Sequence, residues 1–332
     1  MYPPPMTSRP CVIIGAGISG LAAAQALRQQ GVSSILLEKS RGVGGRLATR
    51  RIAVADRTGV ADHGAQFFTV RDTTFATQVS RWRSEAAVDV WYDPDELRYC
   101  GRGGMTAPAK SLARSLDVRL GTRAQAVQAR DDGWTVICED GFRIEGDALL
   151  LTAPVPQSLA LLDAGAVQLP PAAHSALSAI EYEPCAAAML VLDGPSRIPP
   201  PGVLAGEDLD PRLLWIADNQ QKGVSPDAVT LTLHASPAFT LERWDESAED
   251  LAREMISAAG DRLGAAVLAA QVHRWRYARP TRAYPVPSLD PTLSPPLAFA
   301  GDAFAGARVE DAYRSGLSAA EKLLARLSFI RR

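Results

Sequence analysis

The chain of 332 residues is poor in lysine, cysteine and histidine, and it carries little net charge. Only four of its 35 basic residues are lysines, and a net charge of −2 argues against a surface that binds nucleic acid or another polyanion. The four cysteines (Cys11, Cys100, Cys138 and Cys185) and the four histidines lack the spacing of a metal site. We therefore expect no metal, and cysteines that act as small apolar side chains in a reducing compartment.

Long apolar runs are also missing, and none reaches the roughly 18 residues that cross a membrane. Residues 11–27 are mostly apolar, but they hold three glycines and lead into patterned sequence, so we do not interpret them as a signal peptide. Residues 1–10, with four prolines, are expected to form a loose leader. We expect a soluble, cytoplasmic protein of two ordinary domains, or of one domain with a large insertion.

A glycine-rich stretch near the start of the chain lies among segments that predict a strand, a helix and a strand. Val12–Ile14 and Ile35–Leu37 are short apolar runs typical of buried parallel strands. Between them, apolar residues recur at helical spacing from Leu21 to Leu27. The segment therefore predicts a β-α-β unit.

The motif G-x-G-x-x-G occupies the first turn of this unit. Gly15 permits the tight turn, Gly17 lets the backbone approach a pyrophosphate, and Gly20 lets the helix lie close to the strand. The helix start at Ile18 and Ser19 offers free N–H groups to the anion. In this setting the motif predicts dinucleotide binding, and the alternative is a plain glycine-rich turn.

The residues after the second strand distinguish between the possible dinucleotides. Glu38 is placed to accept hydrogen bonds from ribose hydroxyls, with Lys39 beside it at the edge of the cofactor site. Gly44-Gly45-Arg46 resembles the GGR pattern of flavoprotein oxidases, which implies FAD, with the glycines near the cofactor and Arg46 facing its phosphates. The alternative for Arg46 is a solvated surface arginine.

The far end of the chain holds a second constellation. Residues 297–300 predict a strand, and apolar residues after position 309 recur on one helical face. In a split flavin-binding domain the chain returns here, which implies that Asp302 binds the ribityl or pyrophosphate region and that the helix start faces the flavin pyrimidine. The residues assigned to the cofactor here are Gly301, Asp302, Val309, Glu310 and Ala312. The alternative is a strand and helix that merely pack, with Asp302 as a helix cap.

The middle of the chain predicts several short strands. Antiparallel strands and hairpins are expected at residues 118–120, 124–129, 134–138 and 142–144. Residues 148–151, followed by Thr152, resemble the strand that returns under the adenine end of such a cofactor, and Val127 would contact adenine through its backbone.

Four segments together resemble the bacterial renalase-like flavoproteins of the amine-oxidase and p-hydroxybenzoate-hydroxylase-like group: EKSRGVGGRLATRR, DHGAQFFTVRD, HRWRYARP and GDAFAGARVEDAYRSG. The resemblance implies an α/β fold, in which a discontinuous Rossmann-type FAD-binding domain joins a substrate domain built on an antiparallel sheet. It implies oxidation of misreduced nicotinamide dinucleotides, with the hydride at ring position 2 or 6, and transfer of the electrons to O2 to give hydrogen peroxide. No cysteine lies near the C-terminal motif, so FAD is expected to be noncovalent.

The expected domains are interleaved along the chain. The FAD-binding domain takes residues 10–70, 101–155 and 293–328, and the substrate domain takes residues 71–100 and 156–292. Proline-rich stretches in the second half fit loops at the seam.

DHGAQFFTVRD is the candidate for the wall that faces the flavin and its substrate. Gly64 and Ala65 are small enough for the ring to approach, and Gln66 could hydrogen-bond a flavin edge or the substrate. Phe67 and Phe68 could stack on a flat ring. Alternatively, the two phenylalanines belong to the core and Gln66 to a loop.

His234 and Trp275 are further candidates for the active site. The resemblance implies that His234 faces it, although a core histidine is an equal alternative. In HRWRYARP, Trp275 and Tyr277 alternate with Arg274 and Arg276, so one pair faces the cavity, and the residues alone do not decide which. Arg276 or Arg279 could meet a substrate phosphate, with surface salt bridges as the alternative.

The scarcity of lysine bears on the substrate. Many amine oxidases of this group use a lysine that holds a water near flavin N5, but Lys110 and Lys222 lie in no recognisable motif. We therefore disfavour amine oxidation. Two alternatives remain: an enzyme of the same fold that acts on an amine, a porphyrinogen or a polyene, and a noncatalytic FAD-binding regulatory protein. The sequence predicts no oligomeric state.

Overall fold

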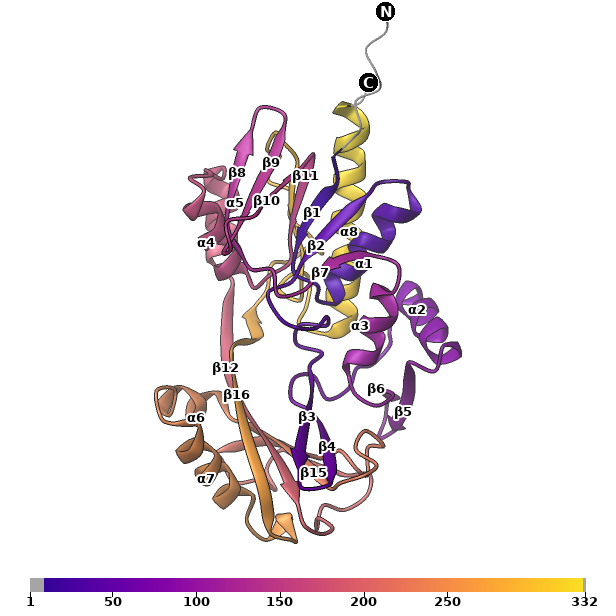
Figure 1. Cartoon of the computed structure of the whole chain (residues 1–332), viewed down its shortest axis with the longest axis vertical. Helices are drawn as coiled ribbons and strands as arrows, with labels where there is room; N and C mark the ends of the chain where they lie inside the picture. The colour runs from indigo at the N-terminus through magenta and orange to yellow at the C-terminus, as the bar shows by residue number, and fades with distance from the viewer. Residues whose placement is uncertain (1–8, 331–332) are drawn as a thin grey trace, which may run out of the picture. The chain divides into compact units, whose positions relative to one another are not determined.

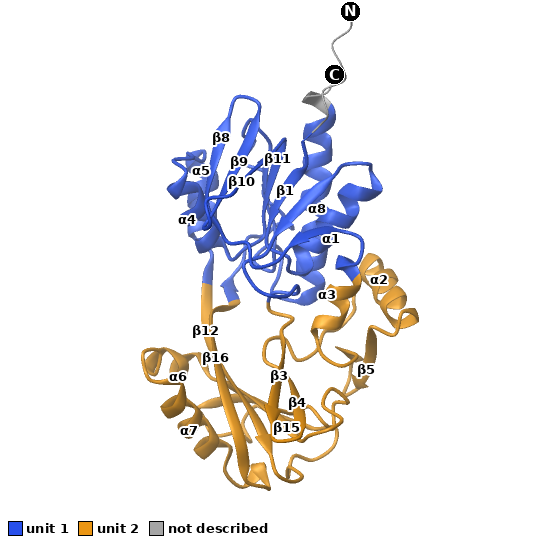
Figure 2. Ribbon diagram, in the orientation of Figure 1, with its two compact units in different colours: residues 1–45, 112–181, 280–332 blue, residues 46–111, 182–279 orange. Residues whose placement is uncertain are grey.

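The computed structural model describes residues 9–330, so the expected leader lies mostly outside the described residues. The chain divides into two compact units, which Figure 2 shows in different colours. Unit 1 comprises Met1–Gly45, Leu112–Glu181 and Pro280–Arg332, and unit 2 comprises Arg46–Ser111 and Tyr182–Arg279. Each unit is therefore built from segments that are far apart in the sequence.

The core of unit 1 is a five-stranded parallel sheet (Figure 1). Its strands, in spatial order, are β17 (Leu297–Phe299), β11 (Ala148–Leu151), β1 (Cys11–Ile14), β2 (Ser34–Leu37) and β7 (Asp117–Arg119). β1 and β11 are buried along their whole length, as expected of central strands whose two faces are covered. The segment at 118–120 was expected to form an antiparallel strand, and this prediction is wrong. The strand found there, β7, pairs in parallel with β2, because it continues the Rossmann-type sheet.

Helices and a smaller sheet complete unit 1. α8 (Val309–Ile330) runs alongside α1 (Ile18–Gln29), as Figure 1 shows. The remaining elements are α4 (Val155–Ala164), α5 (Pro171–Ser178) and the antiparallel strands β8 (Ala124–Arg130), β9 (Gly133–Cys138) and β10 (Arg143–Gly146). The expected hairpins at 124–144 are therefore present.

Unit 2 is built on a five-stranded antiparallel sheet. Its strands, in spatial order, are β13 (Val203–Ala205), β14 (Leu213–Asp218), β15 (Thr230–Ala235), β12 (Glu181–Leu192) and β16 (Val267–Arg282). Two hairpins accompany it, β3 (Thr49–Val54) with β4 (Arg57–Asp62) and β5 (Val88–Tyr92) with β6 (Arg98–Gly101). The helices are α2 (Thr73–Ser84), α3 (Thr106–Ala113), α6 (Pro237–Glu242), α7 (Ala248–Ala259) and the 3-10 turn η1 (Gly260–Leu263).

The unit boundaries differ from the expected domain boundaries, and packing explains the difference. Residues 46–70 belong to unit 2 because the β3–β4 hairpin buries Ile52 and Ala61 against Met189 and Val191 of β12. Residues 156–181 belong to unit 1, where α4 contacts β8. Residues 280–292 also belong to unit 1, where Leu289 forms a bridge with Phe299 of β17.

Candidate functional site

The glycine-rich loop of unit 1 has the geometry of an anion-binding turn. Gly15 has a φ of +107°, which favours glycine, and Gly15 N donates to the carbonyl of Leu37. A Cβ on Gly20 would lie 2.1 Å from the carbonyl oxygen of Gly15, so the helix approaches the end of β1 as closely as the motif predicts.

The start of α1 fits the diphosphate of FAD. Gly17 is the N-cap and makes no side-chain cap, and a Cβ at this position would meet nothing within 4 Å. The next turn contains Ile18 and Ser19, and the hydroxyl of Ser19 is buried without a hydrogen-bond partner in the structure. A buried hydroxyl, an open space over a glycine and an uncapped helix N-terminus are together suited to bind a phosphate oxygen.

Glu38 and Lys39 follow β2. Glu38 is buried, and its two carboxylate oxygens accept from the backbone N–H groups of Ala16 (2.9 Å) and Ser40 (2.8 Å). Glu38 therefore stabilises the glycine-rich loop itself, and each oxygen keeps a further lone pair for a ribose hydroxyl. Lys39 is exposed, and its ammonium donates to the side chain of Gln157 at 3.3 Å.

The second glycine pair lies beside the first loop. Gly44 forms a parallel bridge with Gly17 and donates to the carbonyl of Ala16 at 2.8 Å. Gly45 has a φ of +56°, and a Cβ there would lie 3.6 Å from the Cα of Gly17. Arg46 begins unit 2, and its guanidinium donates to the carbonyl of Tyr277 at 3.1 Å, so a phosphate contact of Arg46 stays a prediction.

Two further residues predicted to contact the cofactor, both from the middle of the chain, belong to unit 1. The hydroxyl of Thr152 donates to the carbonyls of Ile14 (2.9 Å) and Gly15 (3.1 Å), so Thr152 holds the end of β1. Val127 is buried in β8, an edge strand of the small sheet, and Gly165 packs closely on its carbonyl. The adenine contact of Val127 stays a prediction.

The C-terminal constellation joins the same unit. Gly301 follows β17 with a φ of +144°, and its N–H donates to Ser315 of α8 at 2.8 Å. The helix begins at Val309, as expected, with Glu310 buried and Ala312 facing the interior. Asp302 and Glu310 each have at least one interaction partner within the protein. Since two carboxylates already lie in the first turn of α8, part of its dipole is balanced before any flavin binds.

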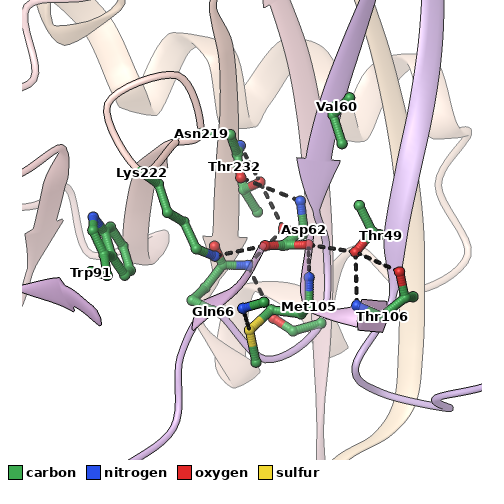
Figure 3. Close-up of polar contacts among 12 residues, drawn as sticks. Thr49, Val60, Asp62, Gln66, Trp91, Met105, Thr106, Asn219, Lys222 and Thr232 are labelled. Atoms are coloured by element: carbon green, nitrogen blue, oxygen red, sulfur yellow. Dashed lines mark hydrogen bonds and ion pairs between the residues drawn. The ribbon is translucent and has the colours of Figure 1, made fainter. Parts of the chain in front are cut away.

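In unit 2, Asp62 at the end of β4 is the centre of a buried polar network (Figure 3). Its carboxylate forms an ion pair with Lys222 at 2.7 Å, and both side chains are fully buried. The other carboxylate oxygen accepts from the hydroxyl of Thr49 (2.6 Å) and the N–H of Met105 (2.7 Å). The carbonyl of Asp62 accepts from Thr232 (2.8 Å), which joins the hairpin to the sheet.

This network fixes the loop DHGAQFF. The Gln66 amide donates to the carbonyl of Asp62 at 2.6 Å, whereas its own oxygen is buried without a partner in the structure. A Cβ on Gly64 would lie 1.9 Å from the carbonyl of Arg46, so packing within unit 2 already requires glycine there. The N–H of Ala65 donates to that same carbonyl.

The two phenylalanines of the loop have different surroundings. Phe68 is buried among Phe75, Trp82 and Tyr99, which makes it a core residue. Phe67 is only partly buried, and the guanidinium of Arg98 lies 4.3 Å from its ring centroid.

Three aromatic side chains gather beside the same loop. His273 and Trp275 lie on one face of β16, and the Trp275 ring stacks on His63 with centroids 5.5 Å apart. Trp275 Nε1 donates to the carbonyl of His63 at 2.8 Å. Of the two alternating sets of side chains in HRWRYARP, the set that contains Trp275 therefore faces this loop. On the opposite face, Arg276 lies over the ring of Trp244.

The histidines of this cluster are held neutral. Burial lowers the pKa of His63 to about 3, with the charge of His273 as a further cause. Burial likewise lowers the pKa of His234 in β15 to about 4, and the Nε2 atom of His234 is buried without a partner in the structure. These imidazoles are suited to pack on a ring or to form a neutral hydrogen bond near pH 7.

Sequence reasoning missed Lys222 and Arg98. Lys222 belongs to a loop that carries no recognised motif, and its ammonium lies 4.9 Å from the centroid of Trp91 as well as beside Asp62. The polar segment DNQQK, which ends at Lys222, is a sequence signal that could have pointed to this lysine. In the structure Asn219 of the same segment is also fully buried and donates to Thr232.

Other site chemistry is limited within residues 9–330. No cluster of His, Cys, Asp or Glu side chains there could hold a metal ion. The four cysteines are free thiols, and burial raises the pKa of Cys11 to about 12. In the described part of the chain, no helix combines the length and the apolar character needed to span a bilayer.

A parallel sheet with a glycine-rich anion-binding turn is typical of a dinucleotide-binding protein of α/β fold. Residues 13–80 match the NAD(P)-binding Rossmann-like domain, and residues 86–324 match the model for flavin-containing amine oxidoreductases. The chain belongs to the flavin-containing amine oxidoreductase family and is an FAD-dependent enzyme.

Solved structures share the fold. A triple mutant of putrescine oxidase, redesigned in its cofactor binding, has a TM-score of 0.67 at 17% identity, and the match covers 96% of this chain and 99% of that one. A protein from Exiguobacterium sp. 255-15 with the provisional designation protoporphyrinogen oxidase has a TM-score of 0.72 at 15% identity, with 97% and 100% covered.

A curated relative matches a shorter region. The FAD-dependent monooxygenase thnD of Trichoderma harzianum is 30% identical over an alignment of 149 residues, and the match covers 42% of this chain. The match spans 36% of the length of that relative.

Proposed function

We propose that this enzyme oxidises nicotinamide dinucleotides whose ring carries the hydride at position 2 or 6, as its resemblance to the renalase-like flavoproteins implies. FAD, when bound, would supply the acceptor for the hydride and the route by which two electrons reach O2, which with two protons would give hydrogen peroxide. The dinucleotide loses the hydride and becomes NAD(P). The protein itself then has to bind and orient the ring and to exclude water.

The observation that carries the proposal is the cluster of His63, His273 and Trp275. A nicotinamide ring is flat, and an aromatic wall matches it by stacking. Loss of the hydride leaves the ring positively charged, so neutral imidazoles favour the product, whereas protonated ones would repel it. Burial lowers the pKa of His63 and of His273, which supports this role.

Two acceptor atoms support recognition of the nicotinamide carboxamide. The oxygen of Gln66 and the Nε2 atom of His234 are both buried without a partner among the described residues. A buried acceptor left unpaired costs about 1–3 kcal/mol, and a ligand N–H would remove that cost. In this proposal Gln66, His234 and Trp275 position the substrate, and none of them transfers a proton.

FAD is proposed to be held without a covalent bond by unit 1. Gly17 and Ser19 would receive the pyrophosphate, and Glu38 the ribose. Asp302 and the start of α8 are proposed to meet the flavin end. The proposed partners are the dinucleotide and O2.

Anaerobic mixing tests the function. The holoenzyme is mixed with 6-dihydro-NAD, with 2-dihydro-NAD and, as a matched control, with ordinary 4-dihydro-NAD. We expect the flavin absorbance to bleach within seconds with the first two, and oxygen to restore it with release of peroxide. Absence of bleaching with both isomers would refute the proposal. Flavin that resists every reductant would favour a noncatalytic FAD-binding protein instead.

The structure favours one second candidate, amine oxidation. Lys222 is buried beside the loop that holds Gln66, and its ion pair with Asp62 leaves the ammonium two further N–H donors. A lysine that holds a water is the feature which many amine oxidases of this group share. Bleaching by putrescine or another amine, but not by the dinucleotides, would select this candidate.

A further inference from the structure

Arg98 of β6 carries a positive charge that the protein does not neutralise. Its guanidinium carbon lies 4.3 Å from the ring centroid of Phe67 and 5.2 Å from that of Tyr92. Its Nε atom is buried without a hydrogen-bond partner in the structure. Cation–π contacts hold the planar fork in place, but they leave its N–H groups free to donate.

A second unpaired donor lies against the same phenylalanine. The Trp215 ring is 5.6 Å from the Phe67 ring, and its Nε1 atom is also buried without a partner within residues 9–330. The neighbouring Trp91, 6.3 Å from Trp215, differs because its Nε1 donates to the carbonyl of Pro201. Two buried N–H donors around one ring are therefore left without a hydrogen-bond partner, which destabilises the protein until a ligand accepts from them.

Three other arginines of unit 2 are neutralised by carboxylates. Arg71 pairs with Glu96, Arg102 with Asp89 and Arg279 with Glu183, at N–O distances of 2.6–2.8 Å. No carboxylate in the described part of the chain pairs with Arg98, although Asp93, Asp95 and Glu96 lie only a few positions away in the sequence. A partly buried arginine without a counter-ion is suited to bind an anion from solution.

We infer that Arg98 and Trp215 form a subsite for a phosphate group of the substrate. The inference rests on the proposed function, because a nicotinamide dinucleotide carries a pyrophosphate for the guanidinium fork to bind. The rings of Phe67 and Tyr92 hold the fork, Arg98 supplies charge and paired donors, and Trp215 Nε1 supplies a further donor. This subsite assigns phosphate recognition to Arg98 rather than to Arg279, whose guanidinium is already paired.

Calorimetric titration of the holoenzyme tests the subsite without any turnover. The probes are ADP-ribose, which carries the pyrophosphate but no nicotinamide, inorganic pyrophosphate, and malonate as a carboxylate control. We expect Arg98→Gln to weaken binding of ADP-ribose about ten-fold or more, as loss of a charged hydrogen bond does. Arg98→Lys should recover part of the affinity, and Trp215→Phe should weaken it several-fold. Arg102→Gln, on the same hairpin but ion-paired to Asp89, is the matched control and should change nothing.

Three results would overturn the inference: no binding of ADP-ribose or pyrophosphate to the wild type, equal effects of Arg98→Gln and Arg102→Gln, or binding of malonate as tight as that of pyrophosphate. The flavin spectrum and the melting temperature of each variant report whether it is folded, and Arg98→Lys keeps the charge if Arg98→Gln does not fold. Binding of phosphates through Arg98, combined with no flavin bleaching by either dihydronicotinamide isomer, would refute the proposed function and leave the subsite standing.

Discussion

Asp62 and Lys222 are 160 positions apart in the chain and form a fully buried ion pair. Two buried charges are costly to desolvate, so the pair is stable only because each partner neutralises the other. The hydrogen bonds of Asp62 to Thr49 and Met105 satisfy its second oxygen. The pair therefore determines the position of the loop that begins at Asp62.

We expect Lys222→Met to lower the free energy of unfolding by about 3–5 kcal/mol, because it leaves the Asp62 carboxylate buried without a counter-ion. Asp62→Asn should also destabilise, and the double variant should cost clearly less than the sum of the two. Denaturant unfolding of the four proteins measures this coupling. The exposed pair Arg102–Asp89 is the control, with a coupling below about 1 kcal/mol. Additive effects at Asp62 and Lys222 would contradict this role of the pair.

His63 links stability to pH. Burial lowers its pKa to about 3, so at mildly acidic pH the unfolded chain binds a proton that the folded protein does not. The stabilising contribution of neutral His63 is therefore complete above its ordinary pKa of 6.5 and is lost as the pH falls towards 3. Each unit of the pKa shift corresponds to about 1.4 kcal/mol.

We expect the free energy of unfolding to fall below pH 6.5, and to fall less steeply in His63→Asn. Denaturant unfolding at a series of pH values from neutral to mildly acidic gives both slopes. His174→Asn, at an exposed position of α5, is the matched control and should keep the wild-type slope. An unchanged slope in His63→Asn would show that other groups dominate.

Gly17 separates cofactor binding from folding. Its φ of −73° is open to any residue, and a Cβ there meets nothing within 4 Å of the protein. We expect Gly17→Ala to lower the stability of the apoprotein by no more than about 1 kcal/mol, the cost of alanine at an N-cap, but to weaken FAD binding about ten-fold or more, because its methyl group fills the space of the pyrophosphate. Fluorescence titration of the apoprotein with FAD measures the affinity. Gly42→Ala, which also adds a methyl group in open space, should bind FAD normally, and equal affinity of both variants would exclude the assigned pyrophosphate site.

At the scale of elements, α1 and α8 pack more closely than side chains would allow. A Cβ on Gly316 of α8 would lie 2.1 Å from the carbonyl oxygen of Ser19 in α1. Since Ser19 belongs to the turn that is proposed to bind phosphate, the position of α8 also determines the position of that turn.

Gly316→Ala should therefore destabilise the protein by about 1–3 kcal/mol, although alanine is the better helix former by about 1 kcal/mol. Thermal or denaturant unfolding checks this prediction. Ala325→Gly, at an exposed position of the same helix, should cost about 1 kcal/mol from helix propensity alone. A stabilised Gly316→Ala variant would mean that the two helices can separate at little cost.

At the scale of the whole molecule, the parts of the fold that local pattern specifies were predictable. The β-α-β unit and the hairpins at 124–144 follow from periodicity and glycine spacing, whereas the strand at 148–151 and the helix start near Val309 were expected from the family resemblance. Strand pairing across long distances was not predictable, because the alternating segment Val118-Arg119-Leu120 has the same pattern whether its partner strand is parallel or antiparallel.

The same limit applies to the candidate site. The glycines of the loop have a local signature, whereas Lys222 finds Asp62 only after the β3–β4 hairpin has packed on the sheet of unit 2. Similarly, Arg98 was one arginine among many until the fold placed Phe67 and Tyr92 under it. The sequence motif did single out Gly64. The structure gives a separate reason for glycine at this position, because a Cβ there would collide with the carbonyl of Arg46 whether or not a flavin ring approaches.

The order of the strands in unit 1 also matters while the ribosome is still making the protein. Four of the five strands have been translated by Leu151, but β17 and α8 follow only after about another 145 residues. During that interval the nascent α1 presents its apolar residues without α8, the helix that packs against it in the folded protein. A nascent chain that stalls before residue 309 would therefore expose the apolar surface of α1, and chaperones would bind it preferentially.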